Sequence, residues 1–312
     1  NKEMKQHPLL TDQETHQSYK HLFQHGRERG YTIGLEGFDE LISFKRKSTF
    51  YVYGPPYSGK STFWHFILVQ LAHLHGWKHV IQSPETGEPS DIYAELTEML
   101  CRGWFKDGYI DPDRLLTAQA FIHSHFLVVT GCNTPKEFLD AADGAESHFG
   151  CPVWSATCDP WNEFYHDITK YGGARDLYLE NVLGDFRENA RAKNRLNCII
   201  THPQNQDDVI KDGVRYQPPT QMHRIAGGQA WGRKGLNMMS VWRPPMPDMD
   251  GNVLRNDNGE PFADNYVGIS LDKVKPRELG ERGKAHLFFD FQKKVYFSKT
   301  GMIENYPPQW GE

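Results

Sequence analysis

A glycine-rich loop has the spacing that binds the phosphates of a nucleotide. The segment Gly54–Ser61, GPPYSGKS, fits the pattern GxxxxGK[ST]. In this pattern the backbone N–H groups cradle the phosphates, the lysine neutralises the β- and γ-phosphate oxygens, and the hydroxyl binds Mg²⁺. We therefore expect ATP, or another NTP or dNTP, bound together with Mg²⁺. The predicted binding residues are Gly54, Pro55, Ser58, Gly59, Lys60, Ser61 and Thr62.

Hydrolysis of a bound nucleotide also requires acidic residues outside this loop. Asp159 ends an apolar segment that we predict to be a strand, and Pro160 turns the chain there, so Asp159 and Ser61 are the expected Mg²⁺ ligands. The alternative for Asp159 is a helix cap. Glu85 and Glu163 are both candidates for the carboxylate that orients the attacking water. If the strand before Glu85 neighbours the strand before the glycine loop, Glu85 lies beside the γ-phosphate, and this geometry favours Glu85.

Strand-like and helix-like segments alternate around these residues. The hydrophobic pattern predicts strands at 48–54, 78–83, 125–131, 151–160 and 197–203 and helices at 60–76, 90–105, 134–150 and 177–194. Ser90 or Asp91 is the expected cap of the second helix. Four further strands are predicted at 238–244, 266–274, 284–291 and 294–298, at hairpin spacing. The fold class is therefore α/β, with a mainly parallel central sheet, helices on both faces and a C-terminal antiparallel β extension.

The composition indicates a globular protein with a large core. The chain has 312 residues, 38% of them hydrophobic, and a net charge of −5, which argues against a monomer coated in basic charge for nucleic acid. Five scattered cysteines without a CxxC pair indicate free thiols in a reducing cytosol. No apolar run approaches the ~18 residues of a membrane span, and no signal-peptide pattern opens the chain. We expect a cytoplasmic protein without a membrane partner, located in the host cytoplasm if it is phage-encoded and in the mitochondrial matrix if it is organellar.

The motifs together resemble those of the RecA-fold, DnaB-like replicative helicases, and most closely the Twinkle-like primase-helicase branch. The resemblance covers roughly residues 30–300 and rests on GPPYSGKST, SPET, DPWNEF, CIITHPQNQ, AGGQAWGRKGLNMMSVWR and KVKPRELGERG. It implies a P-loop NTPase of RecA/DnaB type in which Glu85 is the catalytic glutamate and Asp159 the Walker B aspartate. His202 stands where a polar sensor contacts the γ-phosphate; the DnaB branch has Gln there, and His fits the Twinkle-like branch.

The resemblance further implies that basic residues reach the nucleotide of a neighbouring subunit. Arg243 ends its predicted strand as the family's strand does, and Lys273 matches the lysine of the family's KxR pattern. Lys275 holds the arginine position, which departs from the pattern, and Arg277 lies two residues further on. Arginine binds phosphate through two parallel hydrogen bonds whereas lysine acts as a point charge, so Arg277 is the candidate substitute. A solvated basic strand end is the alternative.

The family carries its channel-facing loops in the region that corresponds to residues 203–235. Within 211–235, five basic residues stand against Asp212. Six copies around one axis would form a positive channel for single-stranded DNA. Tyr216 or Trp231 could stack on bases, although packing in a subunit interface explains Trp231 equally well. The predicted DNA-binding residues are Lys211, Arg215, Arg224, Gly228, Arg233 and Lys234.

The sequence therefore predicts the motor domain of an ATP-dependent replicative DNA helicase. It would work as a homohexameric ring on single-stranded DNA, with primase or other replisome proteins as further partners. Residues 1–30 are expected to form a linker or packing arm, 31–305 the ATPase domain and 306–312 a C-terminal tail. One alternative is a RecA/RadA-type recombinase, against which DPWNEF and the KxK/KxR ending argue. The other is a nucleotide-gated loader or adaptor that is not a motor.

Overall fold

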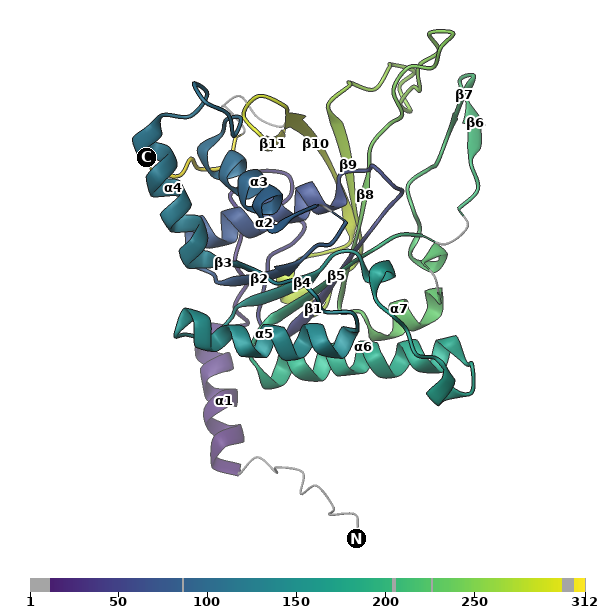
Figure 1. Cartoon of the computed structure of the whole chain (residues 1–312). Coiled ribbons are helices and arrows are strands. Elements are labelled where there is room, and N and C mark those ends of the chain that lie inside the picture. The colour runs from purple at the N-terminus through teal and green to yellow at the C-terminus, as the bar shows by residue number, and fades with distance from the viewer. Residues whose placement is uncertain (1–11, 86, 204–205, 226, 299–305, 312) are drawn as a thin grey trace.

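A single large sheet organises the chain, and helices cover both of its faces (Figure 1). The computed structural model describes residues 12–85, 87–203, 206–225, 227–298 and 306–311. Residues 1–11 of the predicted arm and residue 312 of the predicted tail lie outside this range. The nine strands have the order β11-β10-β9-β8-β1-β5-β4-β2-β3. The predicted α/β class, with a mainly parallel sheet and an antiparallel extension, is confirmed.

The helices are α1 (Asp12–His25), α2 (Lys60–His75), α3 (Pro89–Cys101), α4 (Pro112–His125), α5 (Pro135–Phe149), α6 (Arg175–Ala192) and α7 (Gly228–Lys234). The strands of the large sheet are β1 (Ser48–Tyr53), β2 (His79–Gln82), β3 (Phe126–Val128), β4 (Ser155–Cys158), β5 (Leu196–Thr201), β8 (Asn237–Trp242), β9 (Tyr266–Lys273), β10 (Gly283–Asp290) and β11 (Val295–Ser298). A separate hairpin consists of β6 (Val209–Lys211) and β7 (Val214–Tyr216).

The strand order corrects two expectations about the sheet. β2 does not neighbour β1, because β1 lies between β5 and β8, and β4 separates β5 from β2. β8 pairs with β1 in the parallel sense, so the antiparallel extension begins only at β9. All six residues of β1 are buried, as expected for a central parallel strand covered on both faces.

Successive residues of β1 serve two different core regions. Phe50 and Val52 pack with residues of α2, α3 and α4 on one face of the sheet. Tyr51 and Tyr53 pack with residues of α5, α6 and α7 on the other face. This alternation follows from the two-residue period of a strand, and it produces the three layers seen in Figure 1.

The helix boundaries show why some elements differ from the sequence prediction. α3 begins at Pro89 and is capped by Glu88, not by Ser90 or Asp91; the Asp91 side chain instead accepts a hydrogen bond from the Glu88 N–H at 2.9 Å. This reciprocal capping box stabilises the first turn. The helix ends at Cys101 because Arg102 adopts a left-handed conformation. α4 is absent from the sequence prediction, although Asp111 and Pro112 form an N-cap and N1 pair before it.

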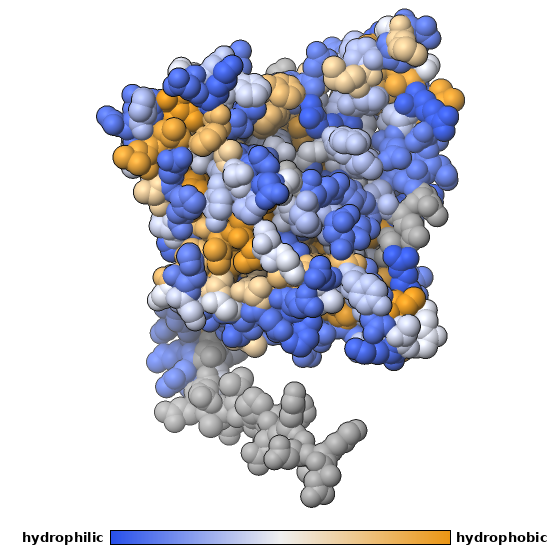
Figure 2. All heavy atoms as spheres, viewed as in Figure 1, coloured by the Kyte–Doolittle hydropathy of each residue, from blue (hydrophilic) through white to orange (hydrophobic). Residues whose placement is uncertain are grey.

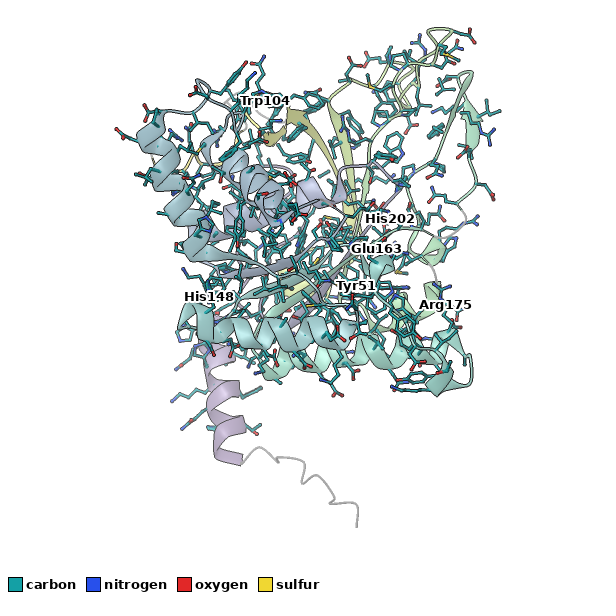
Figure 3. The ribbon with its side chains drawn as sticks, viewed as in Figure 1. Tyr51, Trp104, His148, Glu163, Arg175 and His202 are labelled. Atoms are coloured by element: carbon teal, nitrogen blue, oxygen red, sulfur yellow. The ribbon has the colours of Figure 1, made fainter. Side chains whose placement is uncertain are left out.

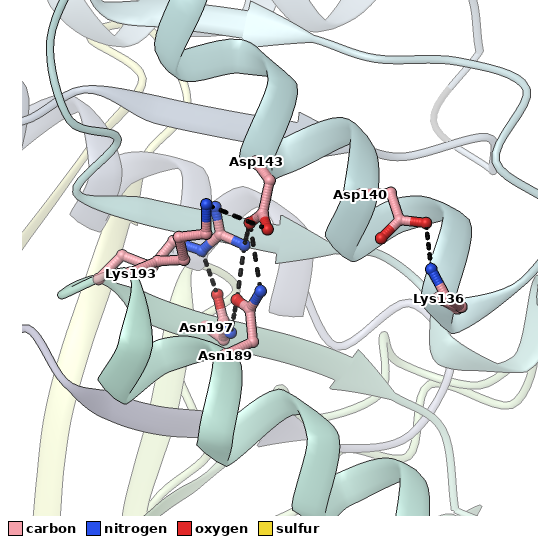
Figure 4. Close-up of polar contacts among 7 residues, drawn as sticks. Lys136, Asp140, Asp143, Asn189, Lys193 and Asn197 are labelled. Atoms are coloured by element: carbon pink, nitrogen blue, oxygen red, sulfur yellow. Dashed lines mark hydrogen bonds and ion pairs between the residues drawn. The ribbon is translucent and has the colours of Figure 1, made fainter. Parts of the chain in front are cut away.

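A buried polar network joins α5, α6 and β5 at the amino-terminal end of β5 (Figure 4). Arg195 has no exposed surface and bonds Asp143 on α5 and Asn189 on α6, each at 2.6 Å. Its Nε donates to Asn197 at 3.1 Å, and Lys193 lies 3.4 Å from Asp143. These contacts pair Nε and one terminal nitrogen of the buried guanidinium with charged and amide partners, whereas its Nη1 has no hydrogen-bond partner among the described residues.

The segments near the two ends of the chain differ in how they contact the rest of the fold. α1 projects from the body of the molecule in Figure 1, and its Tyr19 and Phe23 are exposed. Residues 306–311 instead return to the fold: Trp310 packs against Phe121 of α4, and Tyr306 bonds Asp290 at 2.9 Å. None of the described helices is long and apolar enough to cross a membrane.

Apolar side chains also gather on the surface near α3 and α4 (Figure 2). Trp104, Phe105 and Tyr109 follow α3, Leu116 lies on α4, and between 44% and 69% of each is exposed. Nζ of Lys294, from the turn before β11, lies 3.3 Å from the centroid of the Trp104 ring. The aromatic surface is therefore covered only at its edge.

Candidate nucleotide site

The loop after β1 has the backbone geometry of a phosphate-binding loop. Gly59, immediately before α2, has a φ of 81°, a conformation that glycine adopts without strain. Gly54 approaches β8 so closely that an added Cβ would lie 2.1 Å from the carbonyl oxygen of Val241. None of the described side chains caps α2. The first N–H groups of α2 are thus available to phosphate oxygens, which is how helix N-termini bind anions.

The lysine of the loop is buried beside two carboxylates. Lys60 is 4% exposed, and its Nζ donates a hydrogen bond to the carbonyl oxygen of Pro55 at 2.8 Å. Burial lowers the pKa of Lys60 to about 8, and the negative charges of Asp159 and Glu85 act in the opposite direction. The predicted site residues Lys60, Asp159 and Glu85 are therefore close enough to influence one another.

Asp159 provides a carboxylate that fits a divalent cation. It is 4% exposed, and its pKa is raised because burial outweighs His65, Lys60 and the hydrogen bonds of Ser61 and Ser83. A cation bound by this carboxylate and the Ser61 hydroxyl would compensate that desolvation. Among the described residues, no group of three or more His, Cys, Asp or Glu forms a metal site.

Glu85 and His202 meet although their strands are not adjacent to each other. Nε2 of His202 lies 3.3 Å from Oε2 of Glu85. β2 and β5 are parallel members of one sheet, so the loops after them lie at the same edge, and the loop after β2 reaches past β4. The premise that β2 neighbours β1 was wrong, but Glu85 still lies at the site. Glu163 is exposed in a 3-10 turn; Figure 3 labels it with His202.

Two polar residues that the sequence did not single out hold this edge together. The side-chain oxygen of Asn162 accepts hydrogen bonds from the Thr201 hydroxyl and the His202 N–H, both at 3.1 Å. The Ser83 hydroxyl donates to Asp159 at 3.3 Å. Both residues stand in the predicted motifs, DPWNEF and SPET, but only contacts between distant segments give them a role.

Arg243 lies beside the phosphate-binding loop of its own chain. A Cβ added to Gly59 would lie 3.7 Å from Cδ of Arg243, and the guanidinium lies 5.6 Å from the centroid of the Phe291 ring. Phe291 is 46% exposed. A cavity of about 460 Å³ adjoins Arg243 and is lined by the tip of the loop and by Tyr216, Gln217 and Met246. Arg243 therefore adjoins the phosphate-binding loop of its own chain, whereas the resemblance implies that it reaches the nucleotide of a neighbouring subunit.

Lys273 lies toward the end of the sheet strands that is opposite to the phosphate-binding loop, and Arg277 follows it in the chain. β9 runs antiparallel to β8, so its last residue, Lys273, pairs with Met238 near the start of β8. With about 3.4 Å per residue, Lys273 is roughly 14 Å along the strand from Trp242, at the end of β8 that adjoins the loop. Lys275 and Arg277 follow Lys273 and are exposed. Lys273 therefore lies away from the phosphate-binding loop of its own chain, and its Nζ donates a hydrogen bond to the carbonyl oxygen of Gly232 at 2.5 Å.

The predicted DNA-binding residues occupy two separate regions, the β6–β7 hairpin and the region of α7 with the 3-10 turn beside it. Lys211 and Arg215 lie on the β6–β7 hairpin, Arg224 is exposed in a 3-10 turn, and Gly228, Arg233 and Lys234 lie on α7. Figure 1 shows the hairpin and α7 well apart.

Several of these residues are already engaged within the chain. Arg215 is paired with Asp208 and Arg233 with Glu180, each at 2.7 Å. Trp231, expected to stack on bases or pack in an interface, has no exposed surface and packs against Tyr51 and Trp161 in the core. Both expectations for Trp231 are wrong, because α7 directs it inward.

The sequence was compared with known protein families and with curated proteins. No protein-family profile matches the chain. The sequence is 22% identical over 277 residues to the Twinkle homolog protein, chloroplastic/mitochondrial, of Arabidopsis thaliana, covering 85% of this chain and 36% of that protein. The chain therefore spans about a third of the length of the curated relative that it matches.

Solved structures share the fold. The ATPase domain of one DnaB-like helicase has a TM-score of 0.69 with 14% identity, covering 92% of this chain and 98% of that one. A DnaB-like replicative helicase, described together with its interactions with primase, has a TM-score of 0.68 with 14% identity, covering 91% and 67%. The RadB recombinase has a TM-score of 0.50 with 18% identity, covering 83% and 96%. The chain has the RecA-type fold of DnaB-like helicase ATPase domains, as its motifs predict.

Proposed function

We propose that the protein is the motor domain of a replicative DNA helicase that hydrolyses ATP or another NTP with Mg²⁺. The observation that carries the proposal is the convergence of four motifs at one edge of the sheet. Lys60, Asp159, Glu85 and His202 follow four different strands; the charges of Asp159 and Glu85 act on Lys60, and His202 contacts Glu85. This set supplies the phosphate-binding, metal-binding and water-orienting groups of a P-loop NTPase.

In this proposal each residue of the site has a defined task. The backbone of the loop and Lys60 hold the phosphates, and Ser61 and Asp159 hold Mg²⁺, which neutralises charge between the β- and γ-phosphates. Glu85 orients the attacking water, and His202, held by Asn162, senses the γ-phosphate. Because His202 contacts Glu85 at 3.3 Å, a change at the γ-phosphate would be transmitted to the segment that follows β5.

We further propose that the site is completed by a neighbouring subunit in a homohexameric ring. The position of Lys273 away from the loop of its own chain, and the exposure of Arg277, support this, because the nucleotide that they would serve is then one held by a neighbouring chain. Single-stranded DNA would pass along the axis and contact Lys211, Arg215 and Arg224. Primase or other replisome proteins remain candidate partners.

The decisive experiment measures ATP hydrolysis with and without single-stranded DNA, together with mass in solution with nucleotide bound. We expect DNA to increase turnover and a hexamer to form. The Glu85→Gln variant should lose about 10²–10⁴-fold in turnover while still binding nucleotide. Its matched control, Glu163→Gln, should retain wild-type turnover, because the carboxylate that contacts His202 and acts on the charge of Lys60 is that of Glu85. If single-stranded DNA does not change the turnover, and if Lys60→Ala changes only the binding of a partner, the results favour the loader or adaptor alternative.

A recombinase is the second candidate, favoured by the similarity to the RadB recombinase at a TM-score of 0.50. A recombinase coats DNA as an open filament, whereas the proposed motor closes into a ring. Electron micrographs of the protein with nucleotide and single-stranded DNA separate the two: rings support the helicase, and filaments support the recombinase.

A further inference from the structure

The end of β9 contains a β-bulge that changes the direction of its last side chains. Two residues of β9, Asp272 and Lys273, lie opposite the single residue Met238 of β8. In a regular strand, successive side chains point to opposite faces of the sheet. Here both reach the face that α7 covers: Asp272 accepts a hydrogen bond from the Tyr53 hydroxyl, and Nζ of Lys273 donates to Gly232 of α7. The bulge therefore directs Lys273 toward α7.

The bulge is bonded to the strand that leads into the phosphate-binding loop. Tyr53 is the last residue of β1 and has no exposed surface, and its hydroxyl donates to Oδ2 of Asp272. The Ser270 hydroxyl donates to the other carboxylate oxygen, Oδ1, at 2.8 Å. Both oxygens of Asp272 thus have partners, and straightening the bulge would break both bonds.

A buried amide holds the residues that follow the bulge. Asn237, the first residue of β8, is 2% exposed, and its Oδ1 accepts a hydrogen bond from the N–H of Lys275 at 3.0 Å. Its Nδ2 donates to the Ser48 hydroxyl at 3.0 Å and to the carbonyl oxygen of Thr49 at 3.4 Å, both in β1. One side chain therefore connects the start of β1 to the backbone of Lys275.

Arg277 lies in a short turn that is fixed on both sides. Asn237 holds Lys275 before it. After it, Leu279 is 1% exposed, and its carbonyl oxygen accepts hydrogen bonds from the Ser43 N–H at 2.7 Å and the Ser43 hydroxyl at 2.9 Å. Arg277 itself is exposed. A side chain on a fixed backbone has less freedom to lose on binding than one on a mobile loop, so this turn is preorganised for an external ligand.

We propose that Asn237 and Asp272 are positioning residues for the basic segment 273–277, which would reach the nucleotide of a neighbouring subunit. The proposal rests on the shared site proposed above and names the residues that aim it. Neither side chain would touch the nucleotide. Asp272 keeps the bulge in place, and Asn237 holds the backbone that follows it. Because both are bonded to β1, the basic segment is fixed relative to the strand that carries the phosphate-binding loop.

The first test compares Asn237→Ala with Ser48→Ala. Asn237→Ala removes the bond to the Lys275 backbone, whereas Ser48→Ala removes another bond of the same amide and leaves Lys275 held. In Asn237→Ala we expect turnover to fall by up to about 10²-fold, as misplacement of a reacting group can cost. The affinity for a fluorescent nucleotide should not change, because the phosphate-binding loop is intact. Ser48→Ala should keep wild-type turnover. Wild-type turnover in Asn237→Ala would overturn the proposal.

Mixing with Glu85→Gln separates positioning from a general loss of structure. With equal parts of Asn237→Ala and Glu85→Gln, about a quarter of the interfaces in a ring combine an intact Glu85 with an intact Asn237 of the neighbour. Hydrolysis should therefore recover, as it should when Arg277→Ala replaces Asn237→Ala. A general structural defect would also impair the variant's own site, so mixing would restore nothing.

The mixing results distinguish this proposal from the shared site on which it rests. If mixing restores Arg277→Ala but not Asn237→Ala, the positioning role is wrong and the shared site stands. If mixing restores neither variant, the shared site is wrong and the positioning role is wrong with it.

Hydrogen exchange tests the anchor without turnover. The Lys275 amide, followed by mass spectrometry of the peptide that contains it, should exchange faster in Asn237→Ala than in the wild type or in Ser48→Ala. Unchanged exchange would contradict the anchor. If Asn237→Ala does not fold, Tyr53→Phe keeps the ring and removes the hydroxyl that bonds Asp272. It should then lower turnover and be restored by Glu85→Gln in the same way; wild-type turnover in Tyr53→Phe would contradict the proposal.

Discussion

At the residue scale, burial and neighbouring charges have opposite effects on the pKa of Lys60. The ammonium group is 4% exposed, yet two carboxylates act on it. A triphosphate would add more negative charge at the same point, so nucleotide binding and protonation of Lys60 must favour each other. The affinity of the site therefore carries a pH dependence that can be derived from its structure.

We predict that nucleotide affinity falls as the pH rises above about 8. Burial lowers the pKa of Lys60 to about 8 in the nucleotide-free protein, so the ammonium is lost above that pH and the anion then binds a neutral amine. Each further pH unit should weaken binding by up to about tenfold, whereas below about pH 8 this group adds no dependence. A fluorescent nucleotide titrated between about pH 7 and pH 9.5 measures this. Lys60→Arg, charged throughout, should give weaker but pH-independent binding; an equally steep profile in that variant would assign the effect elsewhere.

The residues of the candidate site could be predicted from the sequence only where they stand in one contiguous motif or directly follow a predictable strand. Lys60 and Ser61 stand in one contiguous motif, and Asp159 and Glu85 each follow a recognisable strand. Asn162 and Ser83 act through partners on distant segments, Thr201–His202 and Asp159, so no spacing in the sequence reveals them. Arg243 was recognisable as a strand end, but only the pairing of β8 with β1 shows which chain's nucleotide it adjoins.

At the element scale, the strands were predictable because each is a short buried run with polar residues at its ends. Their order was not, because crossover helices connect strands that need not be neighbours. β2 is displaced from β1 by β5 and β4 for this reason. The β6–β7 hairpin and α7 are short elements in a polar, glycine-rich segment, and their local pattern is too brief to be distinguished from a loop.

The Arg195 network should determine how firmly α5 and α6 are fixed to the sheet. Arg195→Leu would leave Asp143, Asn189 and Asn197 without their shared partner, and we expect a loss of about 3 kcal/mol in the free energy of unfolding. Urea unfolding followed by circular dichroism measures this loss.

The pair Lys136–Asp140 on α5, drawn beside the network in Figure 4, provides the control for Arg195→Leu. Both of its side chains are mostly exposed, so Lys136→Ala should leave the urea midpoint unchanged. Equal midpoints for Arg195→Leu and the wild type would show that the network is not stabilising.

At the scale of the whole molecule, two apolar surfaces are left largely uncovered by the described residues of the chain. One is the exposed face of α1 with Tyr19, Leu22 and Phe23, spaced three and four residues apart. The other is the patch formed by Trp104, Phe105, Tyr109 and Leu116 near α3 and α4. Different surfaces that lie far apart on one chain favour head-to-tail association, which closes into a ring or extends as a filament. The proposed shared site requires the same kind of association.

Mixing inactive variants tests whether the site is shared. Glu85→Gln lacks the water-orienting group, and Arg277→Ala lacks the charge proposed to reach the next subunit, so each alone should hydrolyse ATP poorly. In a randomly mixed ring with equal parts of both, about a quarter of the interfaces pair an intact Glu85 with an intact Arg277 of the neighbour. Hydrolysis, measured against the mixing ratio with single-stranded DNA present, should therefore recover and peak near equal parts.

The control for this mixing experiment combines Glu85→Gln with Lys60→Ala, whose two defects lie in the site of a single chain. No interface in that mixture contains both residues intact on one subunit, so hydrolysis should stay low at every ratio. If Arg277→Ala hydrolyses ATP and Lys275→Ala does not, Lys275 is the residue that reaches the nucleotide of the next subunit. If Arg277→Ala is inactive alone and mixing does not restore hydrolysis, Arg277 acts only within its own chain. Because it lies away from the phosphate-binding loop, that effect would be indirect and would act through the fold around β9.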